Sequence, residues 1–276
     1  MSCSVQHSGG VDQVLYLYGV MPKDQALTGG LGVPLHALSH AAVTAVFEPV
    51  CAREFSPEAL DEKLKSIEWV AGMSQKHEAV LEQAMRCGPV VPMRLCTLFS
   101  STEALKRSLA DNEGRFLAAL ERIRGREEWG LKVFCDTGRL QTAAAAESFV
   151  LRGIDAQIAA ANPGLAFVLR KKREAWLAEM ASDRLDALVD EVLEAVECVA
   201  DDVRLRPILP ESATGRDIPM ALNAAALVNV SARESYKATI AELSVLHRED
   251  GLVFALSGPF PAYSFCDDAA SAEGGD

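Results

Sequence analysis

The sequence lacks two features that would direct a protein to membranes or nucleic acids. No stretch approaches the run of about 20 apolar residues that a transmembrane helix requires. Acidic residues outnumber basic ones by 39 to 27, and the formal net charge of −12 disfavours binding to phosphate backbones and anionic membrane surfaces. The first residues, MSCSVQHSGGVDQ, lack the basic segment and apolar core of a secretory signal. We therefore predict a cytoplasmic protein whose partners include neither nucleic acid nor membrane.

Motifs of common catalytic, nucleotide and metal sites are missing as well. The seven cysteines are scattered without a C-x-x-C pair, which indicates reduced thiols rather than a disulfide framework or a zinc site. The glycine-containing segment 28–34 is not a G-x-G-x-x-G fingerprint, no serine lies in a G-x-S-x-G elbow, and no P-loop is present. Residue spacing thus supports no catalytic site, and we predict no cofactor and no metal.

The sequence does contain enough apolar residues for two folded domains. Its 276 residues are 49% hydrophobic and 24% charged, which is the globular range. Capping boxes at Ser100-x-x-Glu103 and Ser231-x-x-Glu234, and Ser56 before Pro57, are expected to begin helices. Apolar periodicity predicts strands at 14–20, 43–47, 90–99, 129–135, 203–209, 222–230 and 252–256, and helices at 57–86, 101–123, 142–161, 163–199 and 232–247, with breaks near Ser66 and Asn112.

This order of elements predicts an α+β fold. Counted from Leu131, the order is β-α-β-β-α-β, which is the ferredoxin-like order. We expect two ferredoxin-like α/β sandwich domains in tandem, followed by an extended C-terminal arm. The pattern leaves open which domain owns the strand at Leu131. The expected boundaries are a flexible leader at 1–12, domains at 13–137 and 138–266, and a disordered acidic tail at 267–276.

His77 lies on the apolar stripe of the helix predicted over 57–86 and has two interpretations. As a core histidine it would hydrogen-bond to a carbonyl group. As a haem or metal ligand it would need partners from distant parts of the chain, because no second histidine follows at the H-E-x-x-H spacing. We favour the core histidine.

Three groups of residues are candidates for binding a protein partner. Arg94 and Lys132 lie on predicted strands, where they either form a polar rim at the end of the sheet or pair with acids such as Glu78. The long helix carries Val168 and Trp176 on its expected apolar side, and near its start a basic block that either docks an acidic partner or is solvated beside acids of the same chain. That block consists of Arg170, Lys171, Lys172 and Arg173.

The third candidate is the aromatic segment GPFPAYSF at 258–265. Its two prolines favour extended backbone, and its aromatic rings are Phe260, Tyr263 and Phe265. We expect the segment to lie across a surface with its rings in apolar grooves. The groove belongs either to this chain, which is the favoured interpretation, or to a partner.

Five of these motifs together resemble the gas vesicle protein F/L family. They are LYLYGV at 15–20, HEAVL at 77–81 with VVPMRLCTLF at 90–99, EEWGLKVF at 127–134, PGLAFVLRKKREA at 163–175 and GPFPAYSF at 258–265. The chain departs from the family pattern at Cys96, where glycine is usual, at Phe167, where tyrosine is common, and at Phe260, where the family has tryptophan.

The resemblance implies a non-catalytic accessory protein of gas vesicle assembly, located in the cytoplasm and at the gas vesicle. Its implied partners are the small hydrophobic shell protein and other gas vesicle accessory proteins. The alternative is a haem-binding enzyme, because chlorite-dismutase-like proteins also have tandem ferredoxin-like domains; His77 or His247 would then be the ligand.

Overall fold

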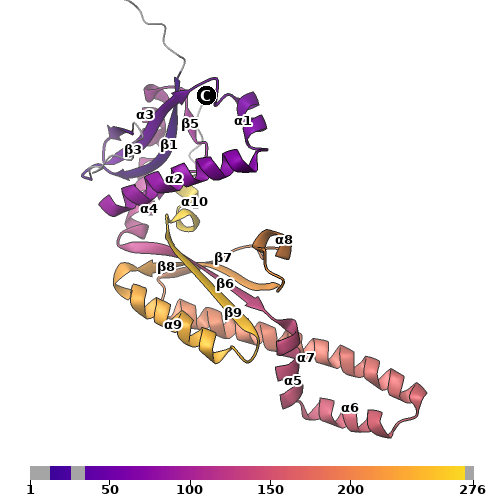
Figure 1. The fold of residues 1–276 in the computed structure, drawn as a ribbon. Helices are drawn as coiled ribbons and strands as arrows, with labels where there is room; N and C mark the ends of the chain where they lie inside the picture. Colours follow the sequence, from indigo (N-terminus) through magenta and orange to yellow (C-terminus); the bar gives the residue numbers. More distant parts are fainter. Residues whose placement is uncertain (1–12, 26–34, 271–276) are drawn as a thin grey trace, which may run out of the picture. The chain divides into compact units, whose positions relative to one another are not determined.

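The computed structural model describes residues 13–25 and 35–270, so the predicted leader and most of the predicted tail lie outside the described residues. The chain forms two compact units (Figure 1). One comprises Met1–Glu128 with Phe260–Asp276, and the other comprises Trp129–Pro259. The end of the chain therefore belongs to the first unit, and the strand at Leu131 belongs to the second. This division differs from the boundaries expected at 137/138 and 266/267.

The first unit contains an antiparallel sheet in the order β2-β3-β1-β4, with β5 also pairing with β1. A register shift interrupts the β1–β3 ladder between Leu17 and Gly19. A Cβ atom at Gly19 would lie 2.7 Å from Val90 Cγ2, so glycine permits the close approach of the neighbouring segment. The strands are β1 (Gln13–Pro22), β2 (His36–His40), β3 (Val43–Cys51), β4 (Val91–Pro92) and β5 (Leu98–Phe99).

Helices cover both faces of this sheet. Tyr16 and Tyr18 pack with residues of α2 on one face, whereas the alternating Leu15 and Leu17 are buried on the other, where α4 contacts the sheet. Ser66 caps α2, and α3 ends at Asn112, which confirms the two predicted breaks. The helices are α1 (Pro57–Lys63), α2 (Ile67–Cys87), α3 (Thr102–Asp111), α4 (Glu113–Ile123), the 3₁₀ turn η2 (Tyr263–Phe265) and α10 (Asp267–Ala270).

Three local predictions for this unit are corrected. Ser101, not Ser100, caps α3 by accepting a hydrogen bond from the backbone N–H of Ala104. The strand expected over 90–99 is split into β4 and β5, because a turn at 94–97 places Cys96 at a φ of 62°. Residues 267–270, expected to be disordered, form α10 instead, with Ala269 buried.

The second unit has a sheet in the order β7-β8-β6-β9. Apolar residues of β6 and β8 pack with α7 and α9 around Val192, Val196 and Tyr236. The strands are β6 (Arg126–Cys135), β7 (Asp202–Leu205), β8 (Met220–Asn229) and β9 (Leu252–Phe260). The helices are α5 (Thr137–Glu147), α6 (Phe149–Ala160), α7 (Pro163–Glu197), α8 (Glu211–Thr214), η1 (Val230–Ala232) and α9 (Arg233–Leu246).

The helix expected over 142–161 is two helices, because Ser148 ends α5 and caps α6. The Ser231 capping box does not form: the Ser231 hydroxyl bonds to Asn229, and Ala232 precedes α9. The strand expected over 203–209 ends at Leu205. Two antiparallel sheets with packed helices nevertheless confirm the predicted α+β class.

A hairpin formed by α6 and the first half of α7 extends past the end of this sheet (Figure 1). The hairpin is only two helices thick there. Val168 and Trp176, expected on a buried side, are consequently exposed.

Candidate interaction surfaces

A buried hydrogen-bond chain in the first unit accounts for His77. Its Nε2 lies 3.1 Å from the carbonyl oxygen of Met93 and its Nδ1 lies 2.8 Å from the Tyr16 hydroxyl. Because a carbonyl only accepts, Nε2–H donates to Met93 and Tyr16 donates to Nδ1. The Tyr16 oxygen in turn accepts from the backbone N–H of Cys96 at 3.2 Å. Burial lowers the pKa of His77 to about 4, so the imidazole is neutral near pH 7, and the core-histidine prediction is confirmed.

The aromatic C-terminal segment packs inside the first unit. Phe265 is only 2% exposed. The Tyr263 hydroxyl donates to Glu78 Oε1 at 3.1 Å, and Ser264 donates to Glu128 from its backbone N–H at 2.8 Å and from its hydroxyl at 3.1 Å. Partial burial raises the pKa of Glu78. The groove that receives these rings therefore belongs to this chain, as the favoured interpretation expected, while Phe260 stays 39% exposed.

Arg94 and Lys132 lie in different compact units. Arg94 is exposed in the turn between β4 and β5 of the first unit. Lys132 is half-buried on β6 in the second unit. The structure thus gives each residue its own local surface rather than one shared sheet edge.

The basic block lies in about the third turn of α7, and two of its four residues pair with acids of the same chain. Arg173 makes two hydrogen bonds to Asp155 of α6, at 2.6 and 3.2 Å, and Lys171 Nζ lies 2.7 Å from Glu174. Arg170 and Lys172 are exposed and have no ion-pair partner within the described part of the chain. Arg173 and Lys171 therefore pair with acids of the same chain, which is one of the two interpretations of the block.

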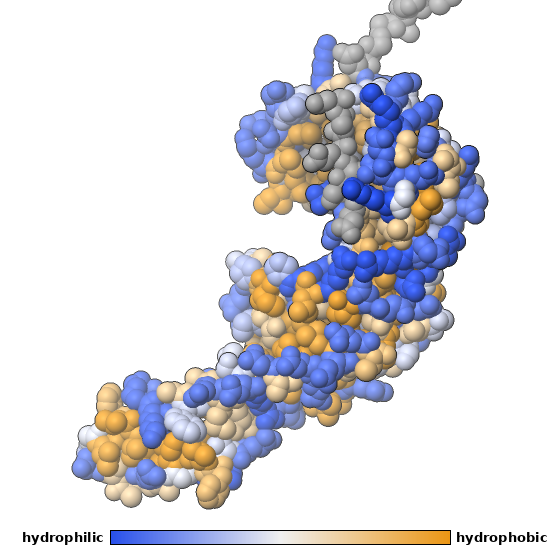
Figure 2. All heavy atoms as spheres, turned by 180° about the vertical axis from the view of Figure 1, so that it is seen from behind, coloured by the Kyte–Doolittle hydropathy of each residue, from blue (hydrophilic) through white to orange (hydrophobic). Residues whose placement is uncertain are grey.

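Exposed apolar side chains accompany these cations. Apolar residues gather at the projecting end of the hairpin (Figure 2). Phe167 and Val168 are each 60% exposed, and Leu165 is also exposed. This surface was not predicted from the sequence, although a signal was present. Successive turns of α7 carry apolar residues on more than one side of the helix, which a single buried stripe does not require. The exposed large apolar residues of α6 and α7 are Phe149, Val150, Leu165, Phe167, Val168 and Trp176.

A second apolar surface lies at the other end of α7. A groove of about 710 Å³ opens between α7 and α9. Val245 on its wall is 76% exposed, and Leu246 beside it is exposed as well. The groove is lined by Ala195, Thr239, Ala241, Glu242, Leu243, Val245 and Leu246.

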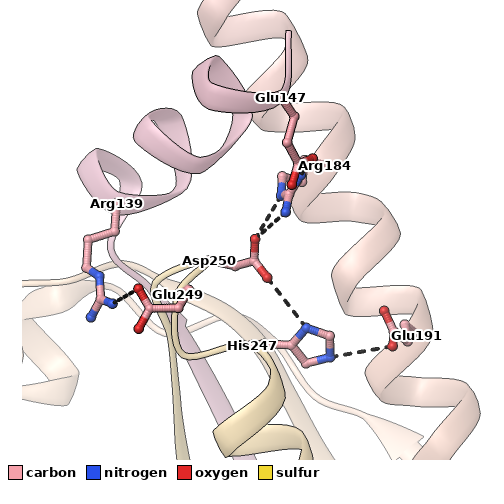
Figure 3. Close-up of polar contacts among 7 residues, drawn as sticks. All are labelled: Arg139, Glu147, Arg184, Glu191, His247, Glu249 and Asp250. Atoms are coloured by element: carbon pink, nitrogen blue, oxygen red, sulfur yellow. Dashed lines mark hydrogen bonds and ion pairs between the residues drawn. The ribbon is translucent and has the colours of Figure 1, made fainter.

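A polar cluster attaches the middle of α7 to the rest of the second unit (Figure 3). The Arg184 guanidinium donates to Asp250, with Nε 2.9 Å from Oδ1, and to Glu147 at the end of α5, with Nη1 2.6 Å from Oε2. The buried His247 ring lies between Asp250 and Glu191, at 3.7 and 3.6 Å. These contacts fix α7 beside α5 and beside the turn that precedes β9.

The two histidines of the haem alternative differ in their surroundings. Both ring nitrogens of His77 are occupied by hydrogen bonds. His247 lies 3.6 and 3.7 Å from the carboxylates of Glu191 and Asp250, and its buried Nε2 has no hydrogen-bond partner among the described residues. Within residues 13–25 and 35–270, no group of three or more histidine, cysteine, aspartate or glutamate residues is arranged to hold a metal ion. Among the same residues, no helix combines the length and the apolar character needed to span a bilayer.

A solved gas vesicle protein shares the overall fold. The crystal structure of GvpF from Anabaena sp. PCC7120 matches with a TM-score of 0.68 at 18% identity, covering 92% of this chain and 98% of that one. At this identity the likeness establishes the fold alone. The fold therefore places the chain in the structural class of this two-sheet gas vesicle protein.

Sequence comparison narrows the class to one family. Residues 14–267 match the family model of the gas vesicle synthesis protein GvpL/GvpF. Gas vesicle protein L of Streptomyces sp. (strain CB03234) is 34% identical over 135 residues, which span 47% of this chain and about half, 51%, of that relative. Gas vesicle protein L2 of Halobacterium salinarum (strain ATCC 700922 / JCM 11081 / NRC-1) is 30% identical over 192 residues, 67% of each chain. The chain belongs to the GvpL/GvpF family, as the five sequence motifs predicted, and this membership supports a gas vesicle role.

Proposed function

We propose that this protein is a non-catalytic accessory factor that binds the small hydrophobic shell protein, together with other accessory proteins, during gas vesicle assembly. The observation that carries the proposal is the exposed end of the α6–α7 hairpin, where apolar side chains lie beside the exposed Arg170 and Lys172. The family match over residues 14–267 supplies the biological context.

Such a surface suits a partner that is itself aggregation-prone. A shell subunit outside the wall exposes apolar surface and strand edges, which associate unless they are covered. A chain of net charge −12 resists its own precipitation while it covers them. Reversible contact through a small apolar patch would keep the subunit competent for assembly.

Each predicted contact residue has a place in this proposal. Arg94, Lys132 and the block at 170–173 contribute charge, and the exposed Phe260 contributes apolar contact. Tyr263 and Phe265 act indirectly, because they lie within the first unit and hold its shape. We also propose that both units are variants of the ferredoxin-like fold. In the second unit, the element order β-α-β-β-α-β and the sheet order β7-β8-β6-β9 support this.

Capture of purified shell protein by the immobilised full chain tests the proposal. Arg170→Glu/Lys172→Glu should reduce capture by about tenfold or more, because it reverses both exposed charges beside the apolar patch. Lys106→Glu/Arg107→Glu on α3, an equally exposed basic pair of the first unit, is the matched control. Capture that is equal for the wild type and both variants would refute the hairpin as the shell-binding surface.

A further inference from the structure

Basic and acidic residues gather at different ends of helix α7. Residues 163–173 contain four basic residues and no acid, whereas residues 186–197 contain five acids and no basic residue. With a rise of about 1.5 Å per residue, this 35-residue helix is roughly 50 Å long. The two charged ends are therefore much farther apart than the Debye length of about 10 Å at moderate salt, and do not neutralise each other.

The basic end of α7 is also apolar. Lys172 follows Val168 by four residues and Lys171 follows Phe167 by four, so both of these exposed apolar residues have a cation one turn away on the same side of the helix. We call residues 163–173 the basic tip.

The acidic end of α7 borders the groove between α7 and α9. Ala195, Leu243, Val245 and Leu246 give the groove apolar walls, and Glu242 lines it. Glu191 precedes Ala195 by four residues, so its exposed carboxylate lies on the same side of α7, one turn away. We call this surface the acidic groove. It combines the same two properties as the basic tip, with the opposite charge.

We propose that a second copy of this chain occupies the acidic groove, with the basic tip of one copy docked between α7 and α9 of another. Apolar contact would remove Phe167, Val168, Val245 and Leu246 from water, and the charges at the rim would be complementary. Two chains of charge −12 repel each other, so the one run of four consecutive basic residues is the natural point of contact. Because tip and groove are different surfaces, the contact is heterologous and leaves a free tip and a free groove, which permits species larger than a dimer.

Sedimentation velocity of the purified full chain, without any shell protein, tests this inference. Between about 5 and 200 µM, the weight-average mass should rise above that of the monomer. High salt should weaken the apparent affinity of self-association by about tenfold, because it screens the charges at the contact. Arg170→Glu/Lys172→Glu at the tip and Ala241→Lys/Glu242→Lys in the groove should each weaken self-association about tenfold or more. Lys106→Glu/Arg107→Glu on α3 should leave it unchanged.

The charge-swapped mixture is decisive. Tip and groove variants that each fail alone should associate when mixed, because the intact tip of the groove variant meets the intact groove of the tip variant. The reversed tip and the reversed groove are also complementary in charge. The inference would be overturned if the wild-type chain stayed monomeric throughout the range. It would also be overturned if the mixture stayed monomeric while both variants kept wild-type circular dichroism and melting temperature. The groove variant leaves the tip intact, so loss of self-association with retained shell capture separates this inference from the proposed function.

Discussion

Two regions with similar chemistry end in opposite environments: the C-terminal aromatic segment and the end of the α6–α7 hairpin. Both carry aromatic rings, and the sequence offered residues of both as candidates for binding a partner. The C-terminal segment meets a unit that already has two helical layers and offers Glu78 and Glu128 as hydrogen-bond acceptors. The hairpin has only two helices, so each helix keeps one side in solvent.

The difference shows that burial depends on the number of layers available, rather than on apolar content alone. A two-helix projection cannot bury the apolar residues on the outer sides of its own helices. Such residues stay exposed unless another molecule covers them, and this is the reason to assign binding to the hairpin and stability to the C-terminal segment.

The largest contrast is expected from removing one phenylalanine in each region. Phe265→Ala should lower the free energy of unfolding by about 3 to 5 kcal/mol, because it deletes a fully buried ring. Phe167→Ala, the same chemical change at an exposed position, should stay within about 0.5 kcal/mol. Urea unfolding followed by tryptophan fluorescence measures both. Equal destabilisation by the two variants would contradict the assignment of these regions.

Acid should weaken the region around the C-terminal segment before it weakens the hairpin. Tyr16, the hydrogen-bond partner of His77, belongs to the apolar cluster on which Tyr263 packs, and burial lowers the pKa of His77 to about 4 from 6.5. Between these values the unfolded chain binds the proton and the folded chain does not. The stabilisation is therefore complete above pH 6.5 and is lost as the pH falls toward 4, by roughly 3 kcal/mol.

Urea unfolding at several pH values between 4 and 7 measures this slope. Glu78 works in the opposite direction, since its raised pKa favours the folded state at low pH. His77→Gln keeps a polar side chain that does not titrate, so its slope should be smaller than that of the wild type. An unchanged slope in this variant would show that other groups cause the acid sensitivity.

Local signals in the sequence predicted the helix breaks at Ser66 and Asn112 and the cap at Ser56, because capping acts within one turn. Ser100 and Ser101 are equally suited to capping, and only the path of the chain into the helix decides between them. The bond between Tyr263 and Glu78 joins residues 185 positions apart, so no periodicity could indicate it. Val168 was misplaced because an apolar pattern does not reveal whether a sheet or solvent faces the helix.

A smaller effect is expected from removing single hydroxyl groups. Tyr263→Phe should cost about 1 to 2 kcal/mol, since it leaves the half-buried Glu78 without a donor. Tyr236→Phe in the second unit is the matched control, because its buried hydroxyl has no hydrogen-bond partner among the residues described. That variant should be neutral or slightly stabilising. Thermal unfolding compares the two, and a larger loss for Tyr236→Phe would reverse the argument.

The smallest expected effect concerns the backbone at Cys96, beside the same cluster. Its φ of 62° lies in the left-handed region, which costs a residue with a Cβ about 1 to 2 kcal/mol, and glycine is usual there in the family that the motifs indicate. Cys96→Gly should therefore be about 1 kcal/mol more stable than Cys96→Ala, since both lose the thiol and only glycine relieves the strain. Cys198, the C-cap of α7, has a φ of −69°. Glycine should be the less stable of the two replacements there, because it gives the unfolded chain more conformational freedom and relieves no strain in the folded one. Urea unfolding of the four variants in reductant compares the free energies of unfolding of the glycine and alanine variants at each site. If the same residue were the more stable at both sites, backbone strain at Cys96 would not affect stability.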